Sequence, residues 1–309
     1  MAIGSTHCRS APVASSTPGS QSASAINAEI MTQTAPGYIA HVHRPVDLRK
    51  GQRAPAILLI GGSGGGIGWQ DYMGDLLAQH GFVVMSLAFF AMDSLPKELD
   101  RIPLEVFDSA LNWLSRYPSV DRTRIGIGAV SKGAEAALLV ASNRADVAAV
   151  GVFSPSGYVF QSVTRDFRST SSWTRNGVDV PFIPYGSAPT GSPTVEFYRA
   201  GRKEANAATL ELATIPVERI NGDVLLLSGD NDTLWGSGEL SELIVSRLRE
   251  KNFSHAVNHT NYPNAGHLIS SIRTDDVTYR GGTKQGNDFA QTDGQRRFIE
   301  FFVRTLRGK

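Results

Sequence analysis

Apolar and polar positions along this chain form alternating blocks that predict strands followed by helices. Short continuous apolar runs are typical of parallel strands covered on both faces, and residues 103–116 carry apolar side chains at helical spacing. The expected strands are 38–45 (an edge strand), 56–60, 82–88, 124–130, 147–153, 223–228 and 256–262, and the expected helices are 71–79, 103–116, 132–140, 237–250 and 294–306. This order predicts an α/β fold with a mostly parallel central sheet and helices on both faces.

Two segments depart from this alternation. Residues 1–30 are rich in Ser and Ala and carry no acidic residue before Glu29, so we expect a disordered head, either a targeting segment or an extension, before a domain over 31–309. Between about residues 155 and 215 the pattern lapses among prolines, aromatic residues and arginines. Long irregular insertions in compact domains are often lids or binding elements, so we expect a lid-like insertion there.

Composition narrows the possible partners. Lys plus Arg (30) nearly balances Asp plus Glu (29), which argues against nucleic acid as a partner. No stretch approaches the roughly 20 apolar residues that span a bilayer. The single cysteine, Cys8, lies in the head, so no disulfide framework or cysteine-rich metal site is expected. We expect a cytoplasmic protein without a cofactor that acts on a small molecule, and a homo-oligomer is compatible with the sequence.

A serine stands where the expected strand 124–130 turns into an apolar helix. Ser131 is followed by Lys132 and Gly133, which is the local chemistry of a nucleophile elbow, a sharp turn that exposes a serine hydroxyl at the sheet edge. Ala129 occupies the place of the first glycine in G-x-S-x-G, and alanine tolerates positive φ less well than glycine. The motif alone is therefore a hypothesis that needs partners elsewhere in the chain.

Two later strands end in the groups that such a serine requires. Asp230 and Asp232 follow the expected strand 223–228, and His267 follows the last expected strand. A histidine can take the serine proton, and a carboxylate can orient that histidine. The order Ser, Asp, His is that of α/β-hydrolases, so we predict that fold with Ser131, Asp232 and His267 as its triad. Asp230 is the alternative acid.

A glycine-rich run, residues 61–66, follows the expected strand 56–60. It lacks the endings of phosphate-binding loops, but its position suits an oxyanion hole in which backbone N–H groups approach a developing negative charge. The predicted donors are the N–H of Ser63 or Gly64 and that of Lys132. The alternative is a flexible turn.

Other polar residues are weaker candidates for a functional site. The histidines lack the neighbours of a metal site, so surface or structural roles are expected and no metal is predicted. The basic residues of the insertion would either meet an anionic substrate or be solvated. These groups are the histidines at 41, 43, 255 and 259 and the basic residues at 165, 168, 175, 199, 202 and 203.

Several stretches together resemble one known family, the acyl-CoA thioesterases and bile acid-CoA:amino acid N-acyltransferases, over roughly residues 55–305. The matching stretches are Ser131-Lys132-Gly133-Ala134-Glu135, His80-Gly81-Phe82, Leu95-Pro96-Lys97, Ile215-Pro216-Val217-Glu218-Arg219-Ile220, the loop with Asp232 and Trp235, and Tyr262-Pro263-x-Ala265-Gly266-His267-Leu268-Ile269. The resemblance is to the C-terminal α/β-hydrolase domain, with dienelactone-hydrolase-like proteins as neighbours. It implies Ser131 as nucleophile, Asp232 as acid and His267 as base.

This resemblance implies a serine hydrolase that cleaves an acyl thioester through an acyl-enzyme. Eukaryotic members carry an N-terminal β-sandwich domain, which the head is too short to form. Members that transfer an acyl group to amino acids use cysteine at the elbow, so serine here favours water as the acceptor. A carboxylic ester hydrolase, an acyl-CoA-dependent acyltransferase and a non-catalytic binding protein are the alternatives. Gly62, Trp235 and Tyr185 are expected to contact the substrate.

Overall fold

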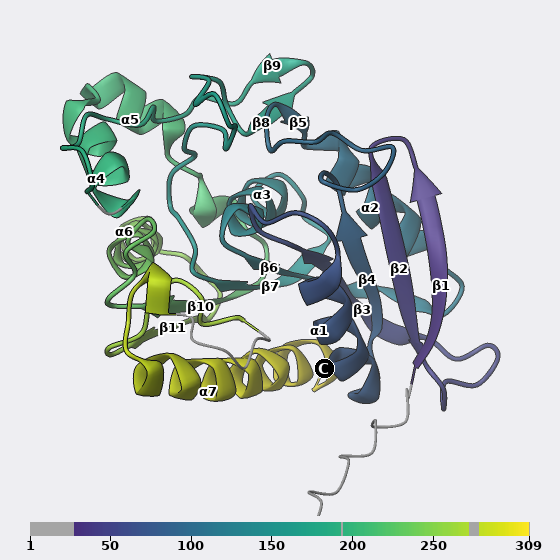
Figure 1. Ribbon diagram of the computed structural model, residues 1–309. Coiled ribbons are helices and arrows are strands. Elements are labelled where there is room, and N and C mark those ends of the chain that lie inside the picture. The colour runs from purple at the N-terminus through teal and green to yellow at the C-terminus, as the bar shows by residue number, and fades with distance from the viewer. Residues whose placement is uncertain (1–27, 193, 272–277, 309) are drawn as a thin grey trace, which may run out of the picture.

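A twisted eight-stranded sheet forms the centre of the molecule (Figure 1), in a computed structural model that describes residues 28–192, 194–271 and 278–308. The strand order is β1-β2-β4-β3-β6-β7-β10-β11; β1 and β2 run antiparallel to their neighbours, and the pairs from β4 onward are parallel. The strands are β1 (Ala28–Ala35), β2 (Tyr38–Pro45), β3 (Ala54–Ile60), β4 (Val83–Ala88), β6 (Val120–Val130), β7 (Val147–Phe153), β10 (Asp223–Gly229) and β11 (Val257–Tyr262). The predicted mostly parallel sheet is confirmed.

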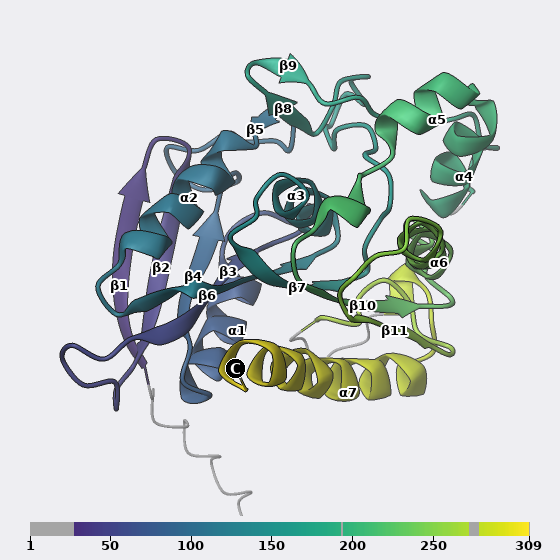
Figure 2. The same cartoon turned by 180° about the vertical axis from the view of Figure 1, so that it is seen from behind.

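Helices cover both faces of this sheet. Figure 2 shows α7 on one side and α2, α3 and α6 on the other. The helices are α1 (Gly68–Gln79), α2 (Glu105–Arg116), α3 (Lys132–Ala141), α4 (Thr194–Glu204), α5 (Ala207–Ala213), α6 (Ser237–Glu250) and α7 (Lys284–Phe302), with the short turns η1 (Val217–Arg219), η2 (Thr278–Arg280) and η3 (Val303–Arg307). No helix of the described residues is both long and apolar enough to cross a bilayer.

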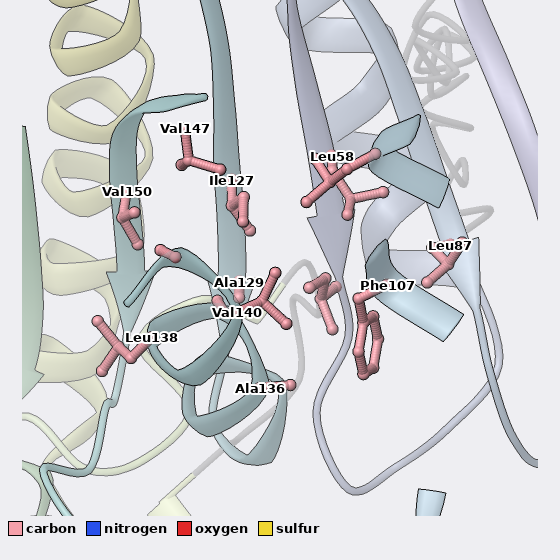
Figure 3. Close-up of a cluster of buried hydrophobic side chains, with 14 of the residues drawn as sticks. Leu58, Leu87, Phe107, Ile127, Ala129, Ala136, Leu138, Val140, Val147 and Val150 are labelled. Atoms are coloured by element: carbon pink, nitrogen blue, oxygen red, sulfur yellow. The ribbon is translucent and has the colours of Figure 1, made fainter. Parts of the chain in front are cut away.

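Alternate residues of each central strand enter different hydrophobic cores. On β3, Leu58 and Ile60 pack with residues of α2 and α3, while Ile57 and Leu59 pack with those of α1 and α7. Figure 3 shows the first core, with side chains of β6, β7 and α3 gathered beside Phe107 of α2. A strand buried on both faces needs apolar residues at every position, which explains the continuous apolar runs.

Glycines on β6 let α7 approach the sheet closely. A Cβ on Gly128 would lie 2.6 Å from the Phe298 ring, and one on Gly126 would lie 2.8 Å from the Phe302 ring. The alternation of isoleucine and glycine before the elbow therefore reflects two different neighbours. The isoleucines face α2 and α3, and the glycines make room for the phenylalanines of α7.

Strand β6 begins four residues and helix α1 three residues before the predicted starts, and three larger expectations about the outer elements are wrong. Strand 38–45 is not an edge strand, because β1 pairs along its whole length and forms the edge itself. Ala28 to Ile30, predicted to belong to the disordered head, lie in β1; the rest of that head and Cys8 lie outside the described residues. Helix α7 begins at Lys284, ten residues before the predicted start at Gly294.

The early start of α7 has a polar cause. Thr283 caps the helix by accepting the backbone N–H of Gly286 at 3.1 Å, and the buried Asn287 accepts the N–H of Gly266 at 2.7 Å. These contacts hold the first turns without an apolar stripe, so the hydrophobic pattern could not detect them.

The insertion over residues 155–215 contains regular elements that the sequence pattern did not predict. Strands β8 (Trp173–Arg175) and β9 (Val178–Asp179) form a small sheet with β5 (Ile102–Pro103), and α4 and α5 follow. Both views place these elements on the side of the sheet occupied by α2, α3 and α6 (Figures 1 and 2).

Candidate active site

Ser131 lies at the apex of a strained turn between β6 and α3. Its backbone has φ 56° and ψ −126°, a combination that costs of order 1–3 kcal/mol for a residue other than glycine. The turn is held by hydrogen bonds from the Ser131 N–H to the Phe153 carbonyl at 2.9 Å and from the Ala134 N–H to the Ser131 carbonyl at 2.8 Å. Ala129 lies in β6 without positive φ, so the strain falls on the serine and not on the position where the motif lacks glycine.

The glycine two residues after the serine is required by packing. A Cβ on Gly133 would lie 2.2 Å from the Gly61 carbonyl oxygen and 2.7 Å from that of Ile60. The first turn of α3 therefore lies directly on the end of β3. Gly62 lies close to the serine, because a Cβ on Gly62 would lie 3.0 Å from the Cβ of Ser131.

A continuous chain of hydrogen bonds joins the three residues predicted as a triad. His267 Nε2 lies 2.8 Å from Ser131 Oγ, and His267 Nδ1 lies 2.8 Å from Asp232 Oδ2. All three side chains are buried. The histidine is oriented through its own backbone, since its N–H donates to the Arg280 carbonyl at 3.0 Å and its carbonyl accepts the Ser154 hydroxyl at 2.7 Å.

Asp232, and not the exposed Asp230, makes this contact. Its Oδ1 accepts the N–H groups of Leu234 at 2.8 Å and Trp235 at 3.3 Å, and its Oδ2 accepts that of Ser237 at 3.1 Å. Burial by itself would raise the pKa of Asp232, but the charge and hydrogen bond of His267 and the bonds from Ser237 lower that pKa to about 2. The carboxylate is therefore ionised at neutral pH.

Two stretches of backbone present N–H groups beside the serine. Among the described residues, the N–H groups of Ser63, Gly64 and Lys132 have no hydrogen-bond acceptor, whereas Gly65 donates to the Gly62 carbonyl at 3.1 Å. Lys132 is the first residue of α3, where N–H groups have no partner within the helix and the helix dipole is positive. A developing oxyanion at this place would meet donors from both sides.

A cavity of about 1210 Å³ opens over this serine. Except for Asp232, which lies behind His267, every residue predicted for the site lines it: Gly62, Ser63, Gly64, Ser131, Lys132, Tyr185, Trp235 and His267. Its remaining walls are largely apolar and include Trp69, Phe197 and Leu234. Such a cavity is large enough for a drug-sized or larger organic molecule.

Trp235 and two tyrosines of the insertion, Tyr185 and Tyr198, line one side of this cavity. The Trp235 ring packs edge-on against His267, with ring centroids 5.6 Å apart. Tyr198 lies between Trp235 and Tyr185, and the two tyrosine hydroxyls lie 3.3 Å apart. Burial raises the pKa of Tyr185 to about 12, so this hydroxyl stays neutral.

The remaining candidates have structural partners. His43 is fully buried, with Nδ1 2.8 Å from Asp75 Oδ1 and Nε2 3.0 Å from the Ser86 hydroxyl; His41 lies 2.8 Å from Asp71. No group of three or more metal-ligating side chains is arranged for a metal ion within the described ranges. Four insertion arginines pair with carboxylates: Arg168 with Glu98, Asp100 and Asp166, Arg175 with Asp108, and Arg199 and Arg202 with Glu239.

Sequence reasoning missed the roles of the Lys132 and Glu135 side chains. They form a buried ion pair directly beside the serine, with Nζ–Oε distances of 3.0 and 3.1 Å. The available signal was a lysine and a glutamate three residues apart in an otherwise apolar helix, a spacing that brings their side chains together.

The sheet and the hydrogen-bonded Ser–His–Asp chain below a cavity define the α/β-hydrolase class. Solved structures agree on the fold: a dienelactone hydrolase from Anabaena variabilis aligns with a TM-score of 0.52 at 14% identity, covering 91% of this chain and 99% of that one. The chain belongs to the family described as BAAT / acyl-CoA thioester hydrolase C terminal, whose model matches residues 102–308. The resemblance inferred from sequence is thus confirmed.

Relatives in this family carry two kinds of name. A mouse peroxisomal succinyl-coenzyme A thioesterase is 26% identical over 82% of this chain and 60% of its own length. A rat acyl-coenzyme A amino acid N-acyltransferase 2 is 31% identical over 70% of this chain and 49% of its own. The matched part of this chain spans between 48% and 62% of the length of such relatives.

Proposed function

We propose that this protein hydrolyses acyl thioesters of the acyl-CoA class, with Ser131 as nucleophile, His267 as general base and acid, and Asp232 as the carboxylate that orients the histidine. The observation that carries the proposal is the continuous hydrogen-bond chain from Asp232 through His267 to Ser131 at the base of the cavity. The family assignment supports thioesters over other acyl compounds.

The first half of the reaction acylates the serine. His267 Nε2 takes the hydroxyl proton while Ser131 Oγ attacks the thioester carbonyl carbon. The carbonyl oxygen becomes an oxyanion, which the N–H of Lys132 and that of Ser63 or Gly64 stabilise. The carbon–sulfur bond then breaks, and the departing thiolate takes the proton from His267, leaving an ester on Ser131.

The second half returns the enzyme to its starting state. His267 removes a proton from water, whose oxygen attacks the ester carbonyl through the same oxyanion position. Collapse breaks the bond to Ser131, which recovers the proton from His267, and releases a carboxylic acid. Throughout, ionised Asp232 keeps the Nδ1 proton of His267 in place and stabilises the imidazolium.

Labelling and turnover test this proposal together. A fluorophosphonate should label the protein, and Ser131→Ala should abolish labelling and the release of thiol from acyl-CoA substrates. Cleavage of aryl esters without any acyl-CoA turnover would favour the carboxylic ester hydrolase. Absence of both labelling and turnover in the unmodified protein would favour a non-catalytic binding protein.

The acyltransferase alternative differs in its acceptor. The relatives named N-acyltransferases keep this alternative open, while serine at the elbow favours water. Free amino acids added to the assay should therefore leave the yield of carboxylic acid unchanged, and an N-acyl amino acid product would assign the acyltransferase activity.

A cytoplasmic location remains a prediction, since one relative is described as peroxisomal.

A further inference from the structure

The ammonium group of Lys132 is enclosed next to the reactive serine. Its side chain is 2% exposed, and Nζ donates to both oxygens of Glu135, at 3.0 and 3.1 Å, and to the carbonyls of Phe160 and Gln161, at 3.0 and 3.1 Å. Burial lowers the pKa of Lys132 and raises that of Glu135. Taking both charges out of water costs several kcal/mol per ion, which apolar side chains of similar volume would avoid.

Glu135 extends this contact to a second part of the insertion. Its Oε2 accepts the indole N–H of Trp173 at 3.0 Å, and its Oε1 accepts the backbone N–H of Phe160 at 3.4 Å. Trp173 belongs to β8, and Phe160 belongs to the segment that enters the insertion. The pair on α3 therefore binds two separate segments of the insertion through directional hydrogen bonds.

Gln161, whose carbonyl accepts from Lys132, makes further polar contacts along the wall of the cavity. The buried side chain of Gln161 accepts the backbone N–H of Tyr185 at 3.1 Å and donates to the Phe167 carbonyl at 3.1 Å. All three of these residues line the cavity over Ser131. The side chain of Lys132 is thus connected, through the Gln161 carbonyl, to the part of the cavity wall that Gln161, Phe167 and Tyr185 form, which we call the insertion wall.

We propose that the Lys132–Glu135 ion pair is a positioning device that holds the insertion wall of the cavity in register with Ser131 and thereby sets which acyl groups are accepted. This inference rests on the proposed function. A buried apolar pair would fill the same space but would leave the Phe160 and Gln161 carbonyls without their charged donor. Since Gln161 orders Tyr185 and Phe167, a small shift of residues 160–161 changes the shape of the acyl-binding wall.

Replacing both Lys132 and Glu135 distinguishes a role in positioning the insertion wall from a contribution to stability alone. In Lys132→Met/Glu135→Leu no buried charge is left unpaired, so the variant should fold. The matched control is Arg247→Met/Glu218→Leu, which removes the two-point ion pair between α6 and η1, with distances of 2.6 and 2.8 Å, away from the residues that line the cavity. Thermal unfolding of both variants measures their stability.

Two measurements then test whether the ion pair positions the insertion wall. Hydrogen exchange at the backbone amides of Gln161 and Tyr185 should speed up in the double variant and not in the control. Across acyl-CoA substrates of increasing chain length, kcat/KM for the preferred length should fall about tenfold, mainly through KM, and the preference among lengths should flatten. The control should keep the preference of the unmodified protein.

Each outcome bears on one of the two proposals. Unchanged exchange at these amides overturns the positioning role whether or not the protein is active. Faster exchange with an unchanged preference among acyl lengths also overturns it, because the pair would then be only structural. If the unmodified protein turns over no acyl-CoA, the proposed function fails, while faster exchange would still support the positioning of the wall.

Discussion

Replacing Asp232 by asparagine changes one atom that faces His267. The side-chain oxygen Oδ1 accepts two backbone N–H groups, from Leu234 and Trp235, so the amide oxygen of asparagine should take that place. Its NH₂ group then faces His267 Nδ1, at the position where Oδ2 now lies 2.8 Å away. An NH₂ donor there favours the histidine tautomer that carries its proton on Nε2.

That tautomer cannot accept the proton of Ser131. Nε2 lies 2.8 Å from Ser131 Oγ, and with a proton on Nε2 the contact becomes a donation to the serine. Loss of the correct tautomer in a serine triad lowers kcat by about 10⁴-fold, which corresponds to about 5.5 kcal/mol in the activation barrier. We expect a loss of this size for thioester hydrolysis by Asp232→Asn.

Thiol release from an acyl-CoA substrate, measured under saturating conditions, gives kcat directly. Asp230→Asn is the matched control, because this exposed aspartate lies in the same loop and should leave kcat within about twofold. A thermal unfolding curve for each variant checks that the protein is folded during the assay. The reasoning is refuted if Asp232→Asn retains more than about a tenth of the activity, or if both variants lose activity equally.

Three further predictions concern stability. The pKa of Asp232 lies near 2 against an ordinary 3.8, so its ionised form stabilises the fold by about 2 kcal/mol above about pH 4, and this contribution is lost as the pH falls through 2. In urea unfolding from pH 5 to 2, the free energy of unfolding should therefore fall less steeply with pH in Asp232→Asn than in the parent. An equal fall in both proteins would contradict the assignment. Gly133→Ala should lower the free energy of unfolding by about 3 kcal/mol or more, because the added Cβ would lie 2.2 Å from the backbone oxygen of Gly61. A loss below about 1 kcal/mol, measured by denaturant titration, would show that the turn can relax. His43→Leu should cost about 2 kcal/mol, since Asp75 loses its histidine partner and Asp71 and the buried Ser86 hydroxyl each lose one of two partners. Equal unfolding midpoints for variant and parent would exclude that role.

Much of the central sheet could be predicted from the order of residues alone. Strand β7 and helix α6 have the bounds that the pattern predicted. These elements lie in the middle of the sheet or pack one face against it, so their burial repeats at the period of a strand or a helix. The order of Ser131, Asp232 and His267, each after an expected strand, predicted the candidate site because parallel strands end at the same edge.

Other features depend on contacts between residues far apart in the chain, which no local pattern records. Strand β1 is mostly exposed and is defined by its pairing with β2. The insertion has no apolar period, because its segments are held by hydrogen bonds to the Lys132–Glu135 pair as well as by a small core. The choice between Asp232 and Asp230 also needed the fold, since only tertiary structure decides which of two carboxylates in one loop points toward His267.

The sequence by itself therefore determined the class of fold, because buried strands and helices repeat at their own periods, and it predicted the three candidate groups at the sheet edge from the strands that they follow. Tertiary structure decided the shape of the cavity and what holds its wall. The contacts behind that wall join the charged Lys132 to carbonyls about 30 residues away in the chain, and a buried charge is tolerated only where the folded chain brings such partners together.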